Sequence, residues 1–393
     1  MNKELIINFL KKHNQPKFRL EQIQKSIFQD GISSWDEIST ISKDLREKLE
    51  KEIKVLSFDV EKVLETRDGQ SVKALLKLDD GNMIETVLIS PKPDTWSVCI
   101  SCQVGCQMGC QFCATGKMGF KRNLTAEEIT DQVLFWIQYL RKTQKDKTQN
   151  TNKTQITNHK TQNPKIENLK FKIENYDISN VVYMGMGEPF LNWENVSESL
   201  KNLIDPKLFG FGSRSISIST SGIPEGVEKL AEEFPQVNLA LSLHFADDQK
   251  RSEIMPINRK NNLEALKKSL QNYFLKTKRK VFLEYVMLEK INDSQEDADK
   301  LVRFVKSIGK LQLLHVNLIR YNAPNVIPSE AEGSKKLDSS TPLRSAQNDN
   351  FKSSSKERTI DFKNYLLQNH IPVTIRKSLG EEIQGACGQL VGK

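Results

Sequence analysis

The chain has 393 residues, of which 37% are hydrophobic and 27% are charged, a balance typical of folded globular proteins. Its first apolar stretch, residues 5–10, is too short for the core of a signal peptide, and no later stretch approaches a membrane span. We therefore expect a cytoplasmic protein without a membrane partner. The net charge of +8 is weak evidence for nucleic-acid binding, because residues 141–174 alone contain nine Lys/Arg and only three Asp/Glu.

Two small regions precede the main part of the chain. Residues 1–54 place apolar and charged residues at helical spacing, which predicts a small N-terminal helical domain. Residues 55–95 change to strand patterns and predict a short β-rich linker region. Within it, strands 72–78 and 83–89 are joined through Asp79, Asp80 and Gly81, residue types that favour a tight turn.

Residues 96–393 alternate helix and strand patterns and predict one α/β core domain. The expected strands are 178–184, 215–219, 238–243, 280–287, 313–318 and 373–376, and the expected helices are 126–140, 225–233, 263–275, 294–308 and 360–369. Such alternation indicates a parallel sheet with right-handed crossovers. Six strands predict a partial (β/α)6 barrel, open at one side, with ligands at the carboxyl ends of the strands.

Two segments of biased composition interrupt this pattern. Lys142–Asn175 repeats Lys-Thr-Gln four times among Asn and Thr, and Ser329–Glu357 is rich in Ser, Lys, Asp and Asn. Neither has enough apolar residues to fold alone, so both are expected to be disordered surface insertions. The first is basic and could contact RNA nonspecifically, although a tolerated insertion is the favoured interpretation.

Five of the six cysteines fall between Cys99 and Cys113. Cys106, Cys110 and Cys113 form C-x3-C-x2-C, and three thiolates on a four-iron cube leave one iron open to bind another molecule. The competing interpretation is a zinc site made from two C-x2-C pairs, 99/102 and 110/113. Those pairs are closer together than in usual zinc ribbons, and a zinc site would leave Cys106 without a role.

Polar motifs follow several predicted strands. Met184–Pro189 reads MGMGEP, in which two glycines allow close backbone approach and Glu188 offers an acceptor for an ammonium group. The other motifs are Ser219–Gly222, Ser242–His244 and Asn322. Taken singly, each suits a turn, but together at one edge of a sheet they indicate a ligand site. A lone cysteine such as Cys387 is ordinarily a small buried hydrophobe, and Glu85 is ordinarily a solvated strand residue.

The cysteine triplet followed by Gly-Glu-Pro resembles the radical S-adenosylmethionine (SAM) superfamily. The resemblance is closest to the RlmN family of RNA adenine-C2 methyltransferases and runs from about Phe18 to the C-terminus, apart from the two insertions. The matching stretches are Ser101–Cys106, Phe112–Gly116, Gly119–Leu124, Gly185–Pro189, Ser217–Gly222, Ser242–His244, Arg376–Lys377 and Ala386–Leu390.

The resemblance implies a role for each matching position. Cys106, Cys110 and Cys113 would hold a [4Fe-4S] cluster. Cys387 would be methylated first, Cys99 would be its thiol partner, and Glu85 would accept a proton. The positions that match the SAM-binding residues are Gly187, Glu188, Ser219, Ser242, Leu243, His244 and Asn322. The N-terminal domain would be an accessory, RNA-binding-like module.

The implied reaction consumes two SAM molecules per turnover. One methylates Cys387, and the second yields a 5′-deoxyadenosyl radical that takes hydrogen from that methyl group. The resulting carbon radical adds to adenine C2, and attack by Cys99 releases the RNA through a transient Cys99–Cys387 disulfide. The substrates would be 23S rRNA and the adenosine 3′ of the anticodon in tRNAs. An external electron donor such as flavodoxin would reduce the cluster, and the protein would act as a monomer.

Two alternatives remain open from the sequence. A Cfr-like enzyme shares the cysteines but methylates adenine C8, whereas a noncatalytic zinc- or cluster-stabilised RNA-binding protein needs neither Cys387 nor Gly-Glu-Pro. One position departs from the family: Cys102 stands where the RlmN family usually has Ser. An extra thiol there could compete for iron or exchange with Cys99, and we expect it to be tolerated.

Overall fold

The computed structural model describes residues 3–92, 95–155, 178–323 and 351–392, with the side chains of 144–155 left out. At the N-terminus, α1 (Lys3–Lys12), α2 (Phe18–Gln24) and α3 (Lys43–Glu52) form the small helical unit that the sequence predicts. Their apolar faces enclose a core of their own around Trp35. Leu134, from the main part of the chain, completes this core and is itself fully buried.

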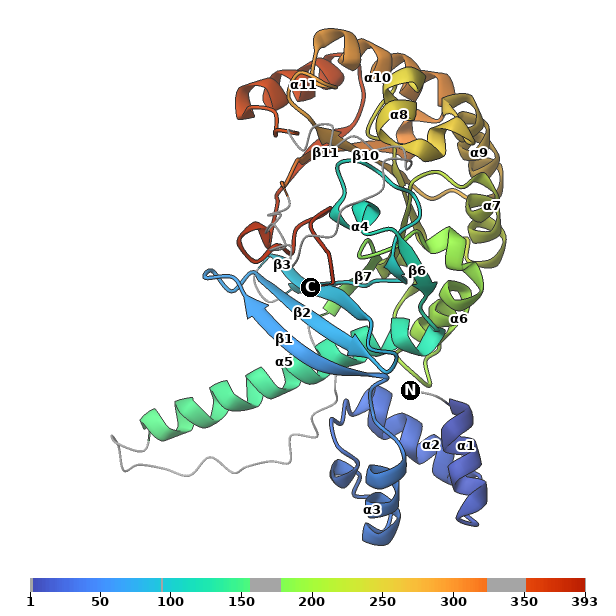
Figure 1. Cartoon of the computed structure of the whole chain (residues 1–393), viewed down its shortest axis with the longest axis vertical. Helices are drawn as coiled ribbons and strands as arrows, with labels where there is room; N and C mark the ends of the chain where they lie inside the picture. The colour runs from blue at the N-terminus through green and yellow to red at the C-terminus, as the bar shows by residue number, and fades with distance from the viewer. Residues whose placement is uncertain (1–2, 93–94, 156–177, 324–350, 393) are drawn as a thin grey trace, which may run out of the picture.

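The described residues form a ten-stranded sheet in the order β1-β2-β3-β4-β7-β8-β9-β10-β11-β12 (Figure 1). The strands are β1 (Phe58–Glu65), β2 (Ser71–Leu78), β3 (Met83–Lys92), β4 (Thr95–Cys99), β7 (Ile178–Tyr183), β8 (Ile216–Thr220), β9 (Asn238–Ser242), β10 (Val281–Met287), β11 (Leu314–Arg320) and β12 (Val373–Arg376). Pairing is antiparallel from β1 to β4 and parallel from β4 to β12. The six predicted parallel strands are therefore confirmed, and β4 adds a seventh.

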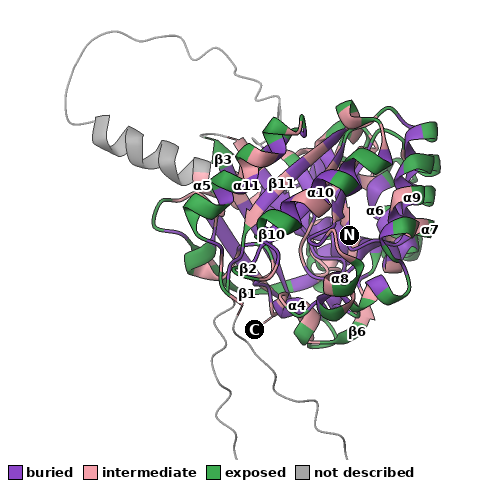
Figure 2. Ribbon diagram, turned by 90° about the horizontal axis from the view of Figure 1, so that it is seen from above, coloured by how far each residue is buried: buried purple, intermediate pink, exposed green. Residues whose placement is uncertain are grey.

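Helices line the outer side of the curved parallel sheet, and the strands of this sheet are largely buried (Figures 1 and 2). They are α5 (Ala126–Gln155), α6 (Trp193–Ile204), α7 (Pro224–Glu233), α8 (Asp248–Ile254), α9 (Leu263–Lys276), α10 (Gln295–Ile308) and α11 (Lys356–Gln368). Helix α10 begins at a capping box between Ser294 and Asp297 and ends at Gly309, which has a φ of 78°. Among the described helices, none has the length and apolar character needed to cross a bilayer.

Parts of both expected disordered insertions have regular structure. Helix α5 continues through Gln155, so the first part of Lys142–Asn175 is helical rather than irregular. Lys and Gln are good helix formers, and they extend a helix that is already nucleated by its buried first half. At the second insertion, Ser353 bridges to Leu288, and Lys356 already begins α11. Residues 156–175 and 329–350 lie outside the described residues.

Leu134 provides a test of how the N-terminal unit is attached. Leu134→Ala should cost about 2–5 kcal/mol in the free energy of unfolding, because it leaves a cavity where α5 meets the N-terminal core. It should also speed proteolytic release of residues 1–55. Leu275→Ala is the matched control, since Leu275 is 84% exposed and should change stability by less than about 0.5 kcal/mol. Equal stability of the two variants would contradict this packing.

Candidate active site

A cavity of about 240 Å³ lies at the carboxyl ends of the parallel strands. The loop that carries Cys106, Cys110 and Cys113, called here the cysteine loop, and the C-terminal segment, residues 384–391, form part of its wall. The predicted site residues that line it are Cys99, Cys106, Cys110, Cys113, Cys387, Gly187, Glu188, Ser219, Ser242, His244 and Asn322. Leu243 and Glu85 are not among its lining residues. The motifs that lie apart in the sequence thus meet at one edge of the sheet, as the topology predicts.

The loop that carries the three cysteines of the C-x3-C-x2-C motif is closed by a two-stranded sheet, β5 (Gln103–Gly105) and β6 (Phe120–Asn123). The Cys106 amide donates to the Gly119 carbonyl at 2.9 Å. A Cβ atom on Gly105 would lie 1.8 Å from that same oxygen, so this close approach requires glycine. The hairpin therefore brings both ends of the loop together and confines the three thiols to the cavity.

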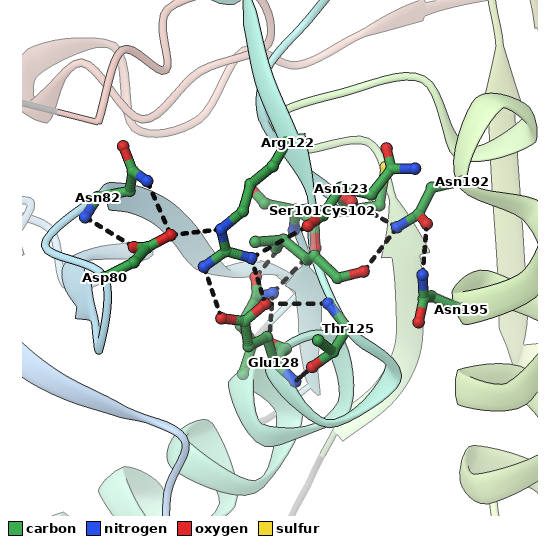
Figure 3. A network of polar contacts seen from close by, with 12 residues as sticks. Asp80, Asn82, Ser101, Cys102, Arg122, Asn123, Thr125, Glu128, Asn192 and Asn195 are labelled. Atoms are coloured by element: carbon green, nitrogen blue, oxygen red, sulfur yellow. Dashed lines mark hydrogen bonds and ion pairs between the residues drawn. The ribbon is translucent and has the colours of Figure 1, made fainter.

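Arg122 of β6 fixes this hairpin to the rest of the fold (Figure 3). Its guanidinium forms two hydrogen bonds of 2.8 Å to the Glu128 carboxylate on α5, and it also donates to Asp80 in the β2–β3 turn. A two-pronged arginine–carboxylate pair restricts orientation as well as distance. On the other side of the loop, the Asn192 amide donates to the carbonyls of Cys102 and Leu124 at 2.8 Å each.

Cys106 and Cys110 are buried and Cys113 is half-buried. Removal from water is the main reason that the pKa values of all three thiols are raised, for Cys106 to about 12. They are therefore protonated at neutral pH unless a metal takes the proton's place. Separate irons of a cube bind separate thiolates, so cluster ligands need not converge on one point. Within the described ranges, no three His, Cys, Asp or Glu side chains are placed to hold a single metal ion.

Cys102 points away from the cavity and into the core. It is 2% exposed, and its thiol donates to the Met186 carbonyl at 3.7 Å. Burial raises its pKa well above the ordinary value, which keeps it a neutral thiol. The hydroxyl of a serine could make the same hydrogen bond. This explains how a cysteine is accommodated at this position without joining the other thiols.

Several predicted SAM-binding positions are shaped for a ligand. The Glu188 carboxylate is buried and accepts hydrogen bonds of 2.7 Å from both the amide and the hydroxyl of Ser221. Gly187 has a φ of 107°, and a Cβ atom there would lie 2.6 Å from Gln103. The Asn322 Oδ1 atom is buried and has no hydrogen-bond partner among the residues that the structure describes. A buried acceptor that lacks a partner is costly, so it fits a site completed by a ligand.

His244 is held as a neutral ring. Its Nδ1 atom accepts a hydrogen bond of 3.1 Å from the Val286 amide, so the proton lies on Nε2. Burial lowers the pKa of His244 to about 3, with a smaller contribution from the nearby Arg251 charge. The edge of its ring meets Phe112 of the cysteine loop, with centroids 5.0 Å apart.

Three charged residues that sequence reasoning did not assign shape the site. Arg251 is fully buried on α8 and donates to the carbonyls of Ser221 and Leu243 at 2.7 and 3.1 Å. It thereby joins the ends of β8 and β9, and its partner at Leu243 is the backbone carbonyl rather than the side chain. Glu284 and Arg376 form an ion pair of 3.1 Å in the cavity wall. An acid inside the apolar strand Val281–Met287 was the available signal for Glu284.

Cys99 and Cys387 line the same cavity, although they lie far apart in the sequence. Cys99 ends β4 and is half-buried, whereas Cys387 is exposed, and both are free thiols in this structure. Burial, and to a smaller extent a negative charge on Cys387, raise the pKa of Cys99 to about 12. The Arg376 guanidinium interacts favourably with thiolates at both positions.

Glu85 lies on β3 beneath the C-terminal segment and is fully buried. One of its oxygens accepts from Lys73 at 2.9 Å and the other from the amide of Val391 at 2.8 Å. The carboxylate is thus engaged on both sides, near the segment that carries Cys387.

Comparisons with known proteins agree with this architecture. The family model described as Radical SAM superfamily matches residues 100–302, and the model described as Ribosomal RNA large subunit methyltransferase N-terminal domain matches residues 1–55. A protein of Clostridium botulinum (strain Okra / Type B1), named ribosomal RNA large subunit methyltransferase Cfr, is 37% identical over 95% of this chain and 92% of its own. The chain belongs to the radical SAM superfamily, in the RlmN and Cfr family of rRNA methyltransferases.

Two further relatives span nearly the whole of this radical SAM methyltransferase. A protein of Syntrophomonas wolfei subsp. wolfei, named probable dual-specificity RNA methyltransferase RlmN, is 37% identical over 97% of this chain and 93% of its own. The crystal structure of a radical SAM methyltransferase from Sphaerobacter thermophilus is 32% identical, with a TM-score of 0.80 over 100% of this chain and 98% of the other. The fold is therefore the radical SAM fold, preceded by a small N-terminal domain.

The amount of iron that the protein binds distinguishes the expected roles of Cys102 and Cys110. After anaerobic reconstitution, Cys102→Ser should retain about four irons per chain, because its side chain faces the core. Cys110→Ser should lose most of that iron, since Cys110 lines the cavity as a proposed ligand. Iron content and the visible absorption of the cluster measure both. An equal loss of iron in Cys102→Ser and Cys110→Ser would contradict the expectation that Cys110 binds the cluster and Cys102 does not.

Proposed function

We propose that this radical SAM methyltransferase methylates C2 of a specific adenosine in 23S rRNA and of the adenosine 3′ of the anticodon in tRNAs. The observation that carries the proposal is the common cavity of Cys99, Cys387 and the three cysteines of the C-x3-C-x2-C loop. An enzyme that only bound a cluster would not need two further thiols there. Adenine C2 carries a hydrogen that no side-chain base removes directly, which excludes simple methyl-cation transfer and makes a covalent route necessary.

Cys106, Cys110 and Cys113 are the proposed ligands of a [4Fe-4S] cluster, which when reduced supplies the electron that cleaves SAM into a radical. Glu188 is proposed to accept the SAM ammonium group, and the free Oδ1 of Asn322 to accept a further hydrogen bond. Gly187, whose positive φ and close contact with Gln103 leave no space for a side chain, lies beside Glu188 in the wall of this proposed site. Ser219 and Ser242, whose hydroxyls are 3.2 Å apart, His244 and the Leu243 backbone complete the proposed SAM site.

The thiols would act in sequence. The Cys387 thiolate takes a methyl group from one SAM by displacement, and that methyl group then loses hydrogen to the radical from a second SAM. The carbon radical adds to C2, and the adduct then loses the C2 proton and one electron, for which the oxidised cluster would be the acceptor. RNA is left bonded to Cys387. Glu85 is the proposed acceptor of that proton. Attack of the Cys99 thiolate on the Cys387 sulfur breaks the bond from that sulfur to the methylene carbon and forms a Cys99–Cys387 disulfide. The methylene carbon leaves with the electron pair and takes a proton, which completes the methyl group on the released base.

The proposed partners are RNA and an external electron donor such as flavodoxin, with the enzyme acting as a monomer. The target adenine must leave its stack to reach the cavity, which suits an unpaired base in folded RNA. Cfr-type C8 methylation is the alternative within the same family. Overall similarity does not separate the two, since the Cfr and RlmN relatives named above are both 37% identical to this chain.

Nucleoside mass spectrometry of treated RNA tests the proposal. Reconstituted enzyme with SAM and a reductant should produce 2-methyladenosine in 23S rRNA and tRNA, because the sequence motifs match the RlmN family throughout. Cys387→Ala should produce none and serves as the control. Formation of 8-methyladenosine instead would assign the enzyme to the Cfr type. A protein that retains zinc alone and cleaves no SAM would support the noncatalytic RNA-binding alternative.

A further inference from the structure

Lys73, to which the proposed function gives no role, lies on the face of the sheet that carries Cys99. Lys73 on β2 is directly opposite Val87 on β3, and Val87 is directly opposite Cys99 on β4. Residues directly opposite one another project to the same side of a sheet. Glu85 precedes Val87 by two positions and therefore shares this face. The C-terminal segment lies against this end of the sheet (Figure 1).

Lys73 and Glu85 form a buried ion pair of 2.9 Å, with side-chain exposures of 7% and 0%. Burying two charges is costly unless further hydrogen bonds satisfy them. Here both further bonds go to the C-terminal segment. The Lys73 ammonium donates to the Gln384 carbonyl at 3.1 Å, and the Glu85 carboxylate accepts from the Val391 amide at 2.8 Å. The pair thus holds the chain on both sides of Cys387.

The backbone at one of these anchors is unusual. Gln384 has a φ of 52°, a left-handed conformation that non-glycine residues rarely adopt. Such a conformation persists only where surrounding contacts hold it. The bond from Lys73 to the Gln384 carbonyl is one of those contacts. The amide of the next residue, Gly385, turns back to the Gly380 carbonyl at 2.8 Å, which closes the turn before Cys387.

We propose that Lys73 is a positioning residue, which acts with Glu85 as a charged clamp that fixes the segment 384–391 and so places Cys387 in the cavity. The clamp itself requires only the contacts above, whereas its effect on methylation rests on the proposed function of Cys387. It gives Glu85 a second task beside the proposed proton transfer. Because the two anchors bracket Cys387, loss of either charge should free the segment without disturbing the parallel strands.

The test compares three full-length, reconstituted variants with the wild type: Lys73→Met, the double variant Lys73→Met/Glu85→Met, and the control Lys77→Met. Lys77 is on the same strand and exposed. The double variant matters because replacing a buried ion pair with apolar residues is often neutral or stabilising for the fold. Hydrogen exchange of backbone amides in 384–391 and the methyl occupancy of Cys387 after incubation with SAM, by mass spectrometry, are the readouts.

The clamp predicts roughly tenfold faster exchange in 384–391 for Lys73→Met and the double variant, as expected for losing hydrogen bonds to charged groups. Exchange in the parallel strands and the melting temperature of the double variant should stay near wild type, and Lys77→Met should change nothing. Methyl occupancy of Cys387 should fall with the faster exchange. Unchanged exchange, or global unfolding of the double variant, would overturn the clamp. Faster exchange with no methylation of Cys387 even in the wild type would instead refute the proposed function.

Discussion

Two hydrogen bonds from the helical turn after Cys113 hold the C-terminal segment against the cysteine loop. The Ala114 amide donates to the Gly388 carbonyl at 2.8 Å, and the Thr115 hydroxyl donates to the Leu390 carbonyl at 2.7 Å. Joining segments so far apart in the sequence costs chain entropy, which these contacts and the Lys73–Glu85 pair must offset. These contacts keep Cys387 in the cavity wall, which the proposed two-thiol chemistry requires.

Burial sets the electrostatics of the site as a whole. Burial holds the three thiols of the C-x3-C-x2-C motif and the His244 ring neutral. The charges that remain, such as Arg251 and Glu188, are stabilised by backbone groups and short hydrogen bonds. A cavity of this kind favours ligands that bring their own charges. Thiolate-bound iron and the zwitterionic end of SAM, the ligands proposed for this site, bring such charges, and Glu188 and Asn322 are the acceptors proposed for SAM.

The parallel strands and most helices could be predicted from the sequence because long apolar runs alternate with amphipathic ones. The edge at which the polar motifs meet followed from the topology alone. Side-chain direction could not be predicted in the same way. Whether Cys102 faces the core or the cavity depends on its neighbours Met186 and Asn192, which lie far along the chain. Which residue pairs with Glu85 depends likewise on the register of the strands. The continuation of α5 into Lys142–Asn175 depends on helix propagation, which composition does not reveal.

The most direct test of the account is to trap the covalent RNA intermediate. Cys99→Ala enzyme, incubated with RNA, SAM and a reductant, is resolved under denaturing conditions, and the adduct site is mapped by mass spectrometry. The account predicts a stable RNA–protein crosslink through Cys387, because no thiol at position 99 is present to release it, and predicts none for Cys387→Ala. Inactivity of both variants without any crosslink would contradict the meeting of these two cysteines in catalysis.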